Sequence, residues 1–166
     1  MILGRMLRPE LIRMELQTTQ PPAPEEPYDH ERFRWSIKEA VLGELTELVA
    51  LSGRIGSANR LRCDMISRER KATTGLAHGV AVPHVRTREA REFVVAFARS
   101  TPGIEFDCLD GGRAHVFIAL VAPPYDDCQY LKIYKQLAEA FVHRDAARVL
   151  LAARDEGEVV RALKEL

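Results

Sequence analysis

The chain has 166 residues, 46% of them hydrophobic, which is enough for one domain with a sizeable core. Its 24 basic and 24 acidic residues balance, so charge gives no reason to expect a nucleic-acid partner or a membrane surface. The longest apolar run is too short to span a bilayer, and the first ten residues show no apolar core or cleavage site of a signal peptide, so we expect neither membrane insertion nor a signal peptide. The three cysteines form no CxxC pair, which favours a reducing, cytoplasmic location.

The first part of the chain predicts a strand, a loop and a helix. Residues 11–16 alternate as a strand does, within an N-terminal strand segment 1–17. Residues 18–30 hold four prolines and three acidic residues, and we expect them to form an extended, solvated loop inserted after the strand. Residues 35–53 predict a helix that ends near Gly53. Its apolar face is formed by Ile37, Val41, Leu45 and Leu48.

A second helix is expected over residues 56–71. Ser57 is a suitable N-cap, because its hydroxyl oxygen can accept a hydrogen bond from the first turn. Ala58, Leu61 and Met65 are expected to point inward.

The second half of the chain predicts strands and then helices. Strand signals lie in residues 79–86, 92–100 and 114–123. A helix is expected over 126–143, and residues 145–166 predict two short helices that are separated near Gly157. This order predicts a single-domain α/β fold, a mixed β-sheet flanked by helices, whose main body spans residues 31–166.

His84 has the most specific setting of the five histidines. His30 lies in the proline-rich loop and His78 in a glycine-rich loop, while His115 opens a strand. His143 ends a helix, where an imidazolium complements the helix dipole. These four positions have simple structural explanations.

His84 follows a proline at the end of a predicted strand, so the chain enters it rigidly. Thr73, Thr74 and the N–H groups of the glycine-rich loop can bind anionic oxygens upstream of it. Arg68 and Arg70 end the preceding helix and can supply planar guanidinium groups to the same place. A neutral imidazole, with an ordinary pKa of about 6.5, is a nucleophile at cellular pH. Beside an anion pocket it suits phosphoryl transfer.

The residues alone leave other interpretations open. A hydrogen-bonded structural histidine at a strand end is the simplest, and it is favoured when position and composition alone are considered. His78, His84 and Cys108 contain zinc-ligand types but show no recognised short spacing. Cys108 as a nucleophile, with His84 or His115 as its base, has no further support, because free cysteines are usually core residues.

Two segments resemble a known family. The segment SRERKATTGLAHGVAVPHVR is similar to the active-site segment of enzyme IIA domains of the fructose/mannitol type (type 2) in the phosphotransferase system. The matching residues are the pairs Arg68–Glu69 and Thr74–Gly75 and the run HGVAVPH, which ends on His84. Downstream, PGIEFDCLDGGRAHVFIALVAPP resembles the family's F-D-x-x-D-G turn and following strand. The resemblance covers roughly residues 35–166 and is greatest for the stand-alone nitrogen-regulatory kind.

The resemblance implies that His84 accepts a phosphoryl group from the phosphocarrier protein HPr, in a nitrogen- or carbon-regulatory role. A IIB domain or a regulated target protein would be the next partner. Arg68 and Thr74 are then expected to bind the phosphate, with His78 and Tyr130 in supporting positions. The resemblance implies no cofactor and no metal.

Tyr130 departs from the family pattern. Family members carry a second histidine in the first turn of the helix that follows APP, and this chain has Tyr130 there. A phenol can donate one hydrogen bond but cannot become cationic, so it stabilises transferred negative charge less. The alternative function is therefore a non-catalytic regulatory module of the same fold, which binds other proteins through its His84 surface.

Overall fold

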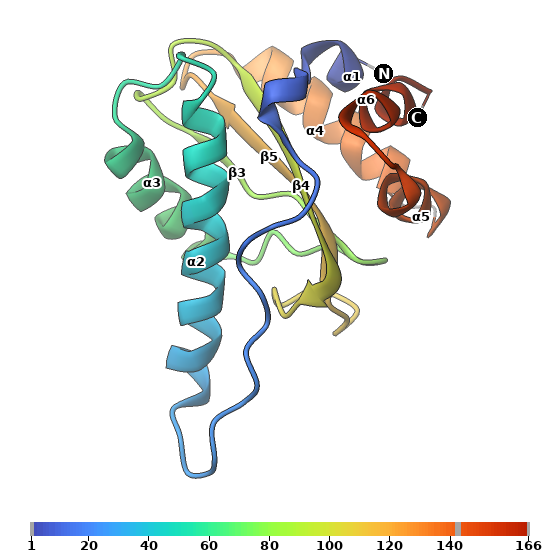
Figure 1. The fold of residues 1–166 in the computed structure, drawn as a ribbon. Helices are drawn as coiled ribbons and strands as arrows, with labels where there is room; N and C mark the ends of the chain where they lie inside the picture. Colours follow the sequence, from blue (N-terminus) through green and yellow to red (C-terminus); the bar gives the residue numbers. More distant parts are fainter. Residues whose placement is uncertain (1, 142–143, 166) are drawn as a thin grey trace.

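A five-stranded mixed sheet forms the centre of the protein. Figure 1 shows the computed structural model, which describes residues 2–141 and 144–165. The two long strands, β4 (Val94–Ile104) and β5 (Ala114–Ala122), pair antiparallel. β1 (Ile12–Arg13) runs parallel to β4, while β2 (Val80–Ala81) and β3 (His84–Arg86) both run parallel to β5. Both faces of β4 and β5 are covered, which explains why the sequences of these strands are almost continuously apolar.

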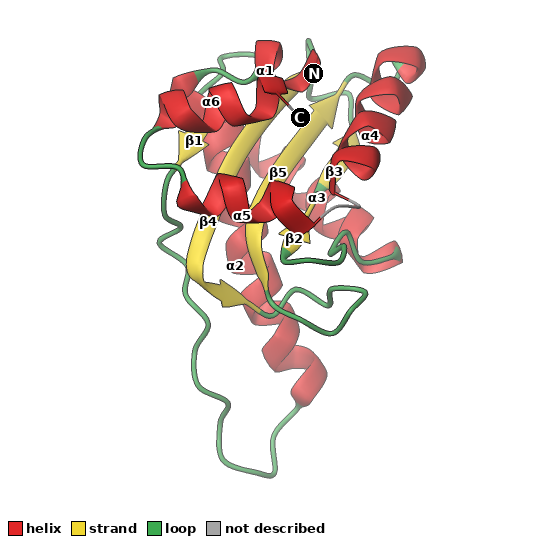
Figure 2. Cartoon of the chain, turned by 90° about the vertical axis from the view of Figure 1, so that its right-hand side faces the viewer, coloured by secondary structure: helices red, strands yellow, loops and turns green. Residues whose placement is uncertain are grey.

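Helices cover both faces of the sheet, as Figures 1 and 2 show. One layer contains α2 (His30–Ala50) and α3 (Ala58–Lys71). The other side carries α1 (Ile2–Met6), α4 (Asp127–Phe141), α5 (Arg144–Ala152) and α6 (Glu156–Glu165). The predicted α/β class, with a mixed sheet flanked by helices, is confirmed. Within the described residues, no helix combines the length and apolarity needed to cross a bilayer.

The two helices of the first layer follow the predicted caps and faces closely. The apolar face predicted for α2 is buried, although the helix begins five residues earlier, where the Asp29 side chain caps it. Ser57 caps α3 by accepting from the Arg60 N–H, and Leu61 and Met65 are buried as predicted. Ala58 is exposed, because it lies in the first turn of α3, before the apolar face of the helix begins.

The N-terminal segment differs from the strand predicted over residues 11–16. Only Ile12–Arg13 pairs as a strand, after the short helix α1 and a 3-10 turn over Pro9–Leu11. Leu3, Leu7 and Leu11 are all buried at a spacing of four, which favours helical turns over alternation. The loop over 18–29 then extends past the sheet beside the first turns of α2 (Figure 1).

Two further boundaries differ from the predictions. The strand predicted over 79–86 is divided into β2 and β3, because Pro83 has no N–H to donate to a ladder. The break between the last two helices precedes Gly157, because Asp155 caps α6 by accepting from the Glu158 N–H. His143, predicted at a helix end, lies outside the described residues.

Candidate active site

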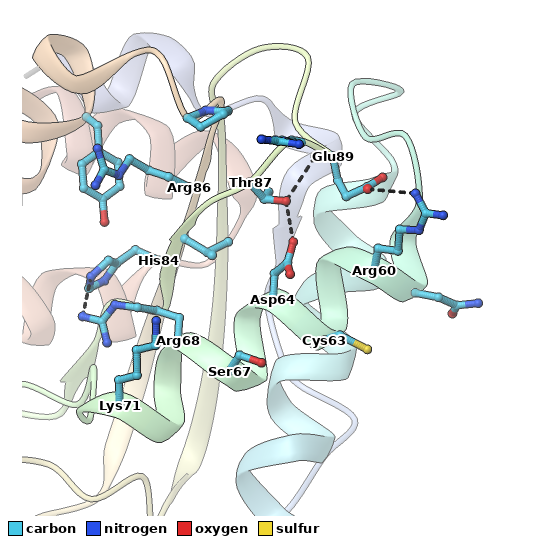
Figure 3. A pocket seen from close by; sticks show the side chains of 15 residues that line it. Arg60, Cys63, Asp64, Ser67, Arg68, Lys71, His84, Arg86, Thr87 and Glu89 are labelled. Carbon is cyan, nitrogen blue, oxygen red and sulfur yellow. Dashed lines mark hydrogen bonds and ion pairs between the residues drawn. The ribbon is translucent and has the colours of Figure 1, made fainter.

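His84 lies in a groove of about 980 Å³ between α3 and the start of α4 (Figure 3). β3 and the loop after it form the floor. The charged residues lining the groove are Arg60, Asp64, Arg68, Lys71, Arg86, Arg88 and Glu89. The groove is therefore rich in cations, and one of them, Arg68, lies within hydrogen-bond distance of the imidazole of His84.

The hydrogen bonds of His84 define its tautomer. Nδ1 lies 2.6 Å from the carbonyl oxygen of Val82, and a carbonyl can only accept, so Nδ1 carries the proton. Nε2 lies 2.9 Å from Nη2 of Arg68, which can only donate, so Nε2 presents its lone pair. Burial lowers the pKa of His84 below the ordinary value of 6.5, and the charge of Arg68 lowers it further. The hydrogen bond to Val82 and the charge of Glu69 raise the pKa but do not cancel this shift. The ring is therefore neutral at cellular pH.

Arg68 is held in place by the end of its own helix. Its Nη1 donates to the carbonyl oxygen of Ala72 at 3.0 Å, just beyond the last turn of α3. The guanidinium thus bridges the helix end and Nε2 of His84. This arrangement fixes a positive charge beside the nucleophilic nitrogen.

Two tyrosines of α4 form the aromatic wall beside His84. The ring centres of Tyr134 and Tyr130 lie 4.9 Å and 6.0 Å from that of His84. The tyrosines are one turn apart and stack on each other at 6.4 Å. Burial raises the pKa of Tyr130, so its phenol is neutral and cannot supply charge.

Arg86 lies on the side of His84 that is opposite Arg68 (Figure 3). Its guanidinium carbon is 5.5 Å from the centre of the Tyr130 ring, a cation–π distance. It also forms an ion pair with Asp127, the first residue of α4. Arg86 therefore bridges β3 and α4 over the groove.

An ion network is centred on the buried pair of Lys38 and Glu69, the residue after Arg68, and ends at the exposed Asp107. Lys38 of α2 is 2% exposed, and its Nζ lies 2.8 Å from Glu69 and 3.0 Å from Asp107. Glu69 also accepts hydrogen bonds from the amide and the hydroxyl of Thr74. The network joins α2, the end of α3 and the loops at residues 74 and 107.

The other predicted site residues lie elsewhere. Among the described residues, neither Thr74 nor His78 lines the groove. Both donors of Thr74 are used by Glu69, while the amide of His78 donates to Asp110 at 2.9 Å in a separate loop. Arg70 turns away to pair with Glu39 at 2.7 Å.

The cysteine and zinc interpretations gain no support. Burial raises the pKa of Cys108 to about 11, with the Asp110 charge adding to the effect, so its sulfur stays a thiol. In residues 2–141 and 144–165, no group of three or more His, Cys, Asp or Glu side chains is placed to hold a metal ion.

Sequence reasoning missed Lys38, Arg86 and Tyr134. Lys38 falls beside Ile37 on the apolar side of its helix, and that position signals burial. Arg86 follows His84 by two residues on a strand, which places both on one face. Tyr134 lies one helical turn after Tyr130, so it shares the face that meets His84.

Comparisons with known proteins identify the family of the chain. Residues 32–166 match the family described as "Phosphoenolpyruvate-dependent sugar phosphotransferase system, EIIA 2". The chain is 31% identical over 131 residues to the PTS system fructose-specific EIIA component of Haloferax volcanii, covering 79% of this chain and 85% of that protein.

Two solved structures share the fold. The nitrogen regulatory protein IIA-Ntr from Neisseria meningitidis superposes with a TM-score of 0.81 at 21% identity, covering 98% of this chain and 99% of that one. Enzyme IIA mannitol of Escherichia coli, in its complex with phosphorylated enzyme IIB mannitol, gives 0.72 at 18% identity, covering 96% and 98%. At these identities the likeness concerns the fold alone. The family match and the Haloferax relative carry the assignment: the chain belongs to the type 2 enzyme IIA family of the phosphoenolpyruvate-dependent sugar phosphotransferase system.

Proposed function

We propose that this protein accepts a phosphoryl group from HPr on Nε2 of His84. One observation carries the proposal: the main chain holds the proton of His84 on Nδ1, so the Nε2 lone pair faces a guanidinium in an open groove. A neutral nucleophile beside a fixed cation is what transfer of an anionic phosphoryl group requires.

The proposed step forms one bond and breaks one. The Nε2 lone pair forms the new N–P bond as the bond between phosphorus and the donor nitrogen breaks, and that electron pair leaves with the donor. The Nδ1 proton stays on the ring, bonded to the Val82 carbonyl. A ring protonated there leaves as neutral imidazole in the next transfer, so the same hydrogen bond prepares His84 to act as a donor. Arg68 balances the charge of the phosphoryl oxygens in both directions.

The family assignment supports the proposed partners. HPr is the proposed donor, and a IIB domain or a regulated protein in nitrogen or carbon metabolism is the proposed receiver. The Escherichia coli structure, in which a IIA protein binds phosphorylated IIB, supports a IIB contact for this fold. With these partners, the proposed site of action is the cytoplasm.

Labelled phosphoenolpyruvate, enzyme I and HPr test the proposal. We expect the wild-type protein to take up an acid-labile, base-stable label, and His84→Ala to take up none. His78→Asn is the matched control, because His78 has a φ of +60°, which Asn tolerates, and lies outside the groove lining. Equal labelling of His84→Ala would contradict the assignment of the acceptor.

Tyr130 favours a second candidate function, a regulatory module that binds proteins without accepting phosphate. It occupies the place of a histidine in the family pattern and supplies no charge to His84. A wild-type protein that binds HPr, seen as NMR shifts around the groove, yet takes up no label would support this second function over the first.

A further inference from the structure

Arg68 reaches a phosphoryl group on His84 from one side only. Its Nη1 is bonded to the Ala72 carbonyl, and its Nη2 faces Nε2 of His84 at 2.9 Å. A phosphoryl group has three outer oxygens, each a strong acceptor. Enzymes that transfer this group surround its oxygens with cations and N–H donors. A second donor on the other side of the ring would complete such a site.

Arg86 stands on that other side. It follows His84 by two residues on β3, and alternate residues of a strand share one face. Its guanidinium lies against the ring of Tyr130, whose centre is 6.0 Å from that of His84. Figure 3 shows the side chains of Arg86 and Arg68 on the two sides of His84, within one groove.

Arg86 is held there by an exposed ion pair. Its partner is Asp127, and the two side chains are 47% and 63% exposed. Ion pairs this exposed contribute little to stability, because water and salt screen them. A phosphoryl group on the buried His84 ring carries more charge than one carboxylate, so it competes well for the same guanidinium.

We propose that Arg86 is the second phosphate-binding cation of this site, and that it leaves Asp127 to bind the phosphoryl oxygens on His84. The inference rests on the proposed function and extends it. The Tyr130 ring holds the guanidinium close to the groove in the free protein. Asp127 then competes with the phosphoryl group for Arg86 and sets how firmly the protein retains that group.

Arg86→Gln tests the inference, with Arg113→Gln as the matched control. Arg113 also forms an exposed ion pair, with Glu105, at side-chain exposures of 46% and 52%, and it does not line the groove. The readout is the equilibrium constant for transfer from phosphorylated HPr. We expect it to fall about three- to tenfold for Arg86→Gln, as for loss of a partly exposed charged hydrogen bond. Arg113→Gln should leave it unchanged.

Asp127→Asn should raise the same constant, because it releases Arg86. That gain should vanish when Arg86→Gln is also present, since Asp127 acts only through this arginine. A gain that persists in the double variant would overturn the exchange, because Asp127 would then act on the phosphoryl group directly.

Inorganic phosphate gives a readout that needs no donor. Its dissociation constant, followed through the ring NMR signals of His84, should rise about three- to tenfold in Arg86→Gln and stay constant in Arg113→Gln. Phosphate binding that depends on Arg86, in a protein that HPr does not label, would retain Arg86 as a phosphate-binding cation and reject the proposed function. Labelling and phosphate binding that are both unchanged in Arg86→Gln would overturn the inference and leave the function standing. A wild-type protein that neither is labelled nor binds phosphate would overturn both.

Discussion

Arg68 and Glu69 are neighbours in the chain, yet they serve two different regions of the molecule. Arg68 faces the groove and touches His84, while Glu69 faces the interior and pairs with the buried Lys38. The groove ion pair between Arg86 and Asp127 is about half exposed, whereas the side chains of Lys38 and Glu69 are 2% and 1% exposed. One region can exchange its partners and the other cannot.

The difference follows from the dielectric around each pair. Exposed charges are solvated whether or not they are paired, so a new anion can displace an old one with little penalty. Buried charges have no such alternative, because an ion left alone in the interior is strongly destabilised. The buried network therefore holds the end of α3 in place, while the exposed ion pair of the groove is the one that a proposed phosphate could displace.

The largest expected effect is the loss of stability when Lys38 of the buried pair is replaced. Lys38→Met leaves Glu69 buried without its cation, and we expect a loss of about 3–5 kcal/mol in the free energy of unfolding, measured by chemical denaturation. Arg70→Gln is the control, because it removes an exposed ion pair and should cost about 0–1 kcal/mol.

The double variant Lys38→Met with Glu69→Gln tests whether the unpaired charge of Glu69 causes this loss of stability. It removes both charges, so part of the lost stability should return. A single variant Lys38→Met as stable as the wild type would show that the interior network is solvated, contrary to its burial.

Arg68→Lys should affect the groove and spare the interior. The variant keeps the charge and loses the planar fork that joins Ala72 and His84. A charged hydrogen bond contributes about 1.5–3 kcal/mol, so phosphoryl transfer from HPr should slow by about ten- to a hundredfold. The unfolding free energy should change little. Unaltered transfer kinetics would mean that Arg68 acts only as a helix-end charge.

The smallest expected effect concerns the titration of His84. Because its pKa is lowered in the folded protein, its ring signals should titrate with a midpoint below 6.5 in NMR. The unfolded chain takes up this proton first as the pH falls. The stability contributed by the neutral ring is therefore present above pH 6.5 and is lost as the pH falls through the folded midpoint.

His84→Asn serves as the control for that loss, since it lacks the titrating ring. Its unfolding free energy should fall less than that of the wild type over the same acidic range. A wild-type midpoint at or above 6.5 would contradict the burial argument, since the groove would then hydrate the ring fully.

Local rules were enough to predict much of this structure. The Ser57 cap and the apolar face of α2 follow from spacing alone. The motif around His84 also placed Arg68 near it, at the end of the preceding helix, and the structure brings the two together at 2.9 Å. Such features depend on residues close in sequence.

The remaining features depend on pairs that are far apart in the chain. Lys38 meets Asp107 across 69 positions, and Arg86 meets Asp127 across 41. Sheet topology brings these residues together, and no spacing rule contains that information. Thr74 shows a different limit. Glu69 is only five residues away, yet the match to the family motif did not reveal that Glu69 would use both donors of Thr74.

The oxygen that selects the tautomer of His84 belongs to the main chain of Val82, so no side-chain replacement can delete it. Val82→Ile would keep that oxygen, and a mutational scan would score the position as ordinary core. A thioamide at Val82 would reach it and keep the ring of Pro83, because a thiocarbonyl sulfur accepts hydrogen bonds more weakly than a carbonyl oxygen. The path of the main chain thus fixes which nitrogen of His84 carries the proton, and chains of very different sequence can share this tautomer if their backbones follow the same path.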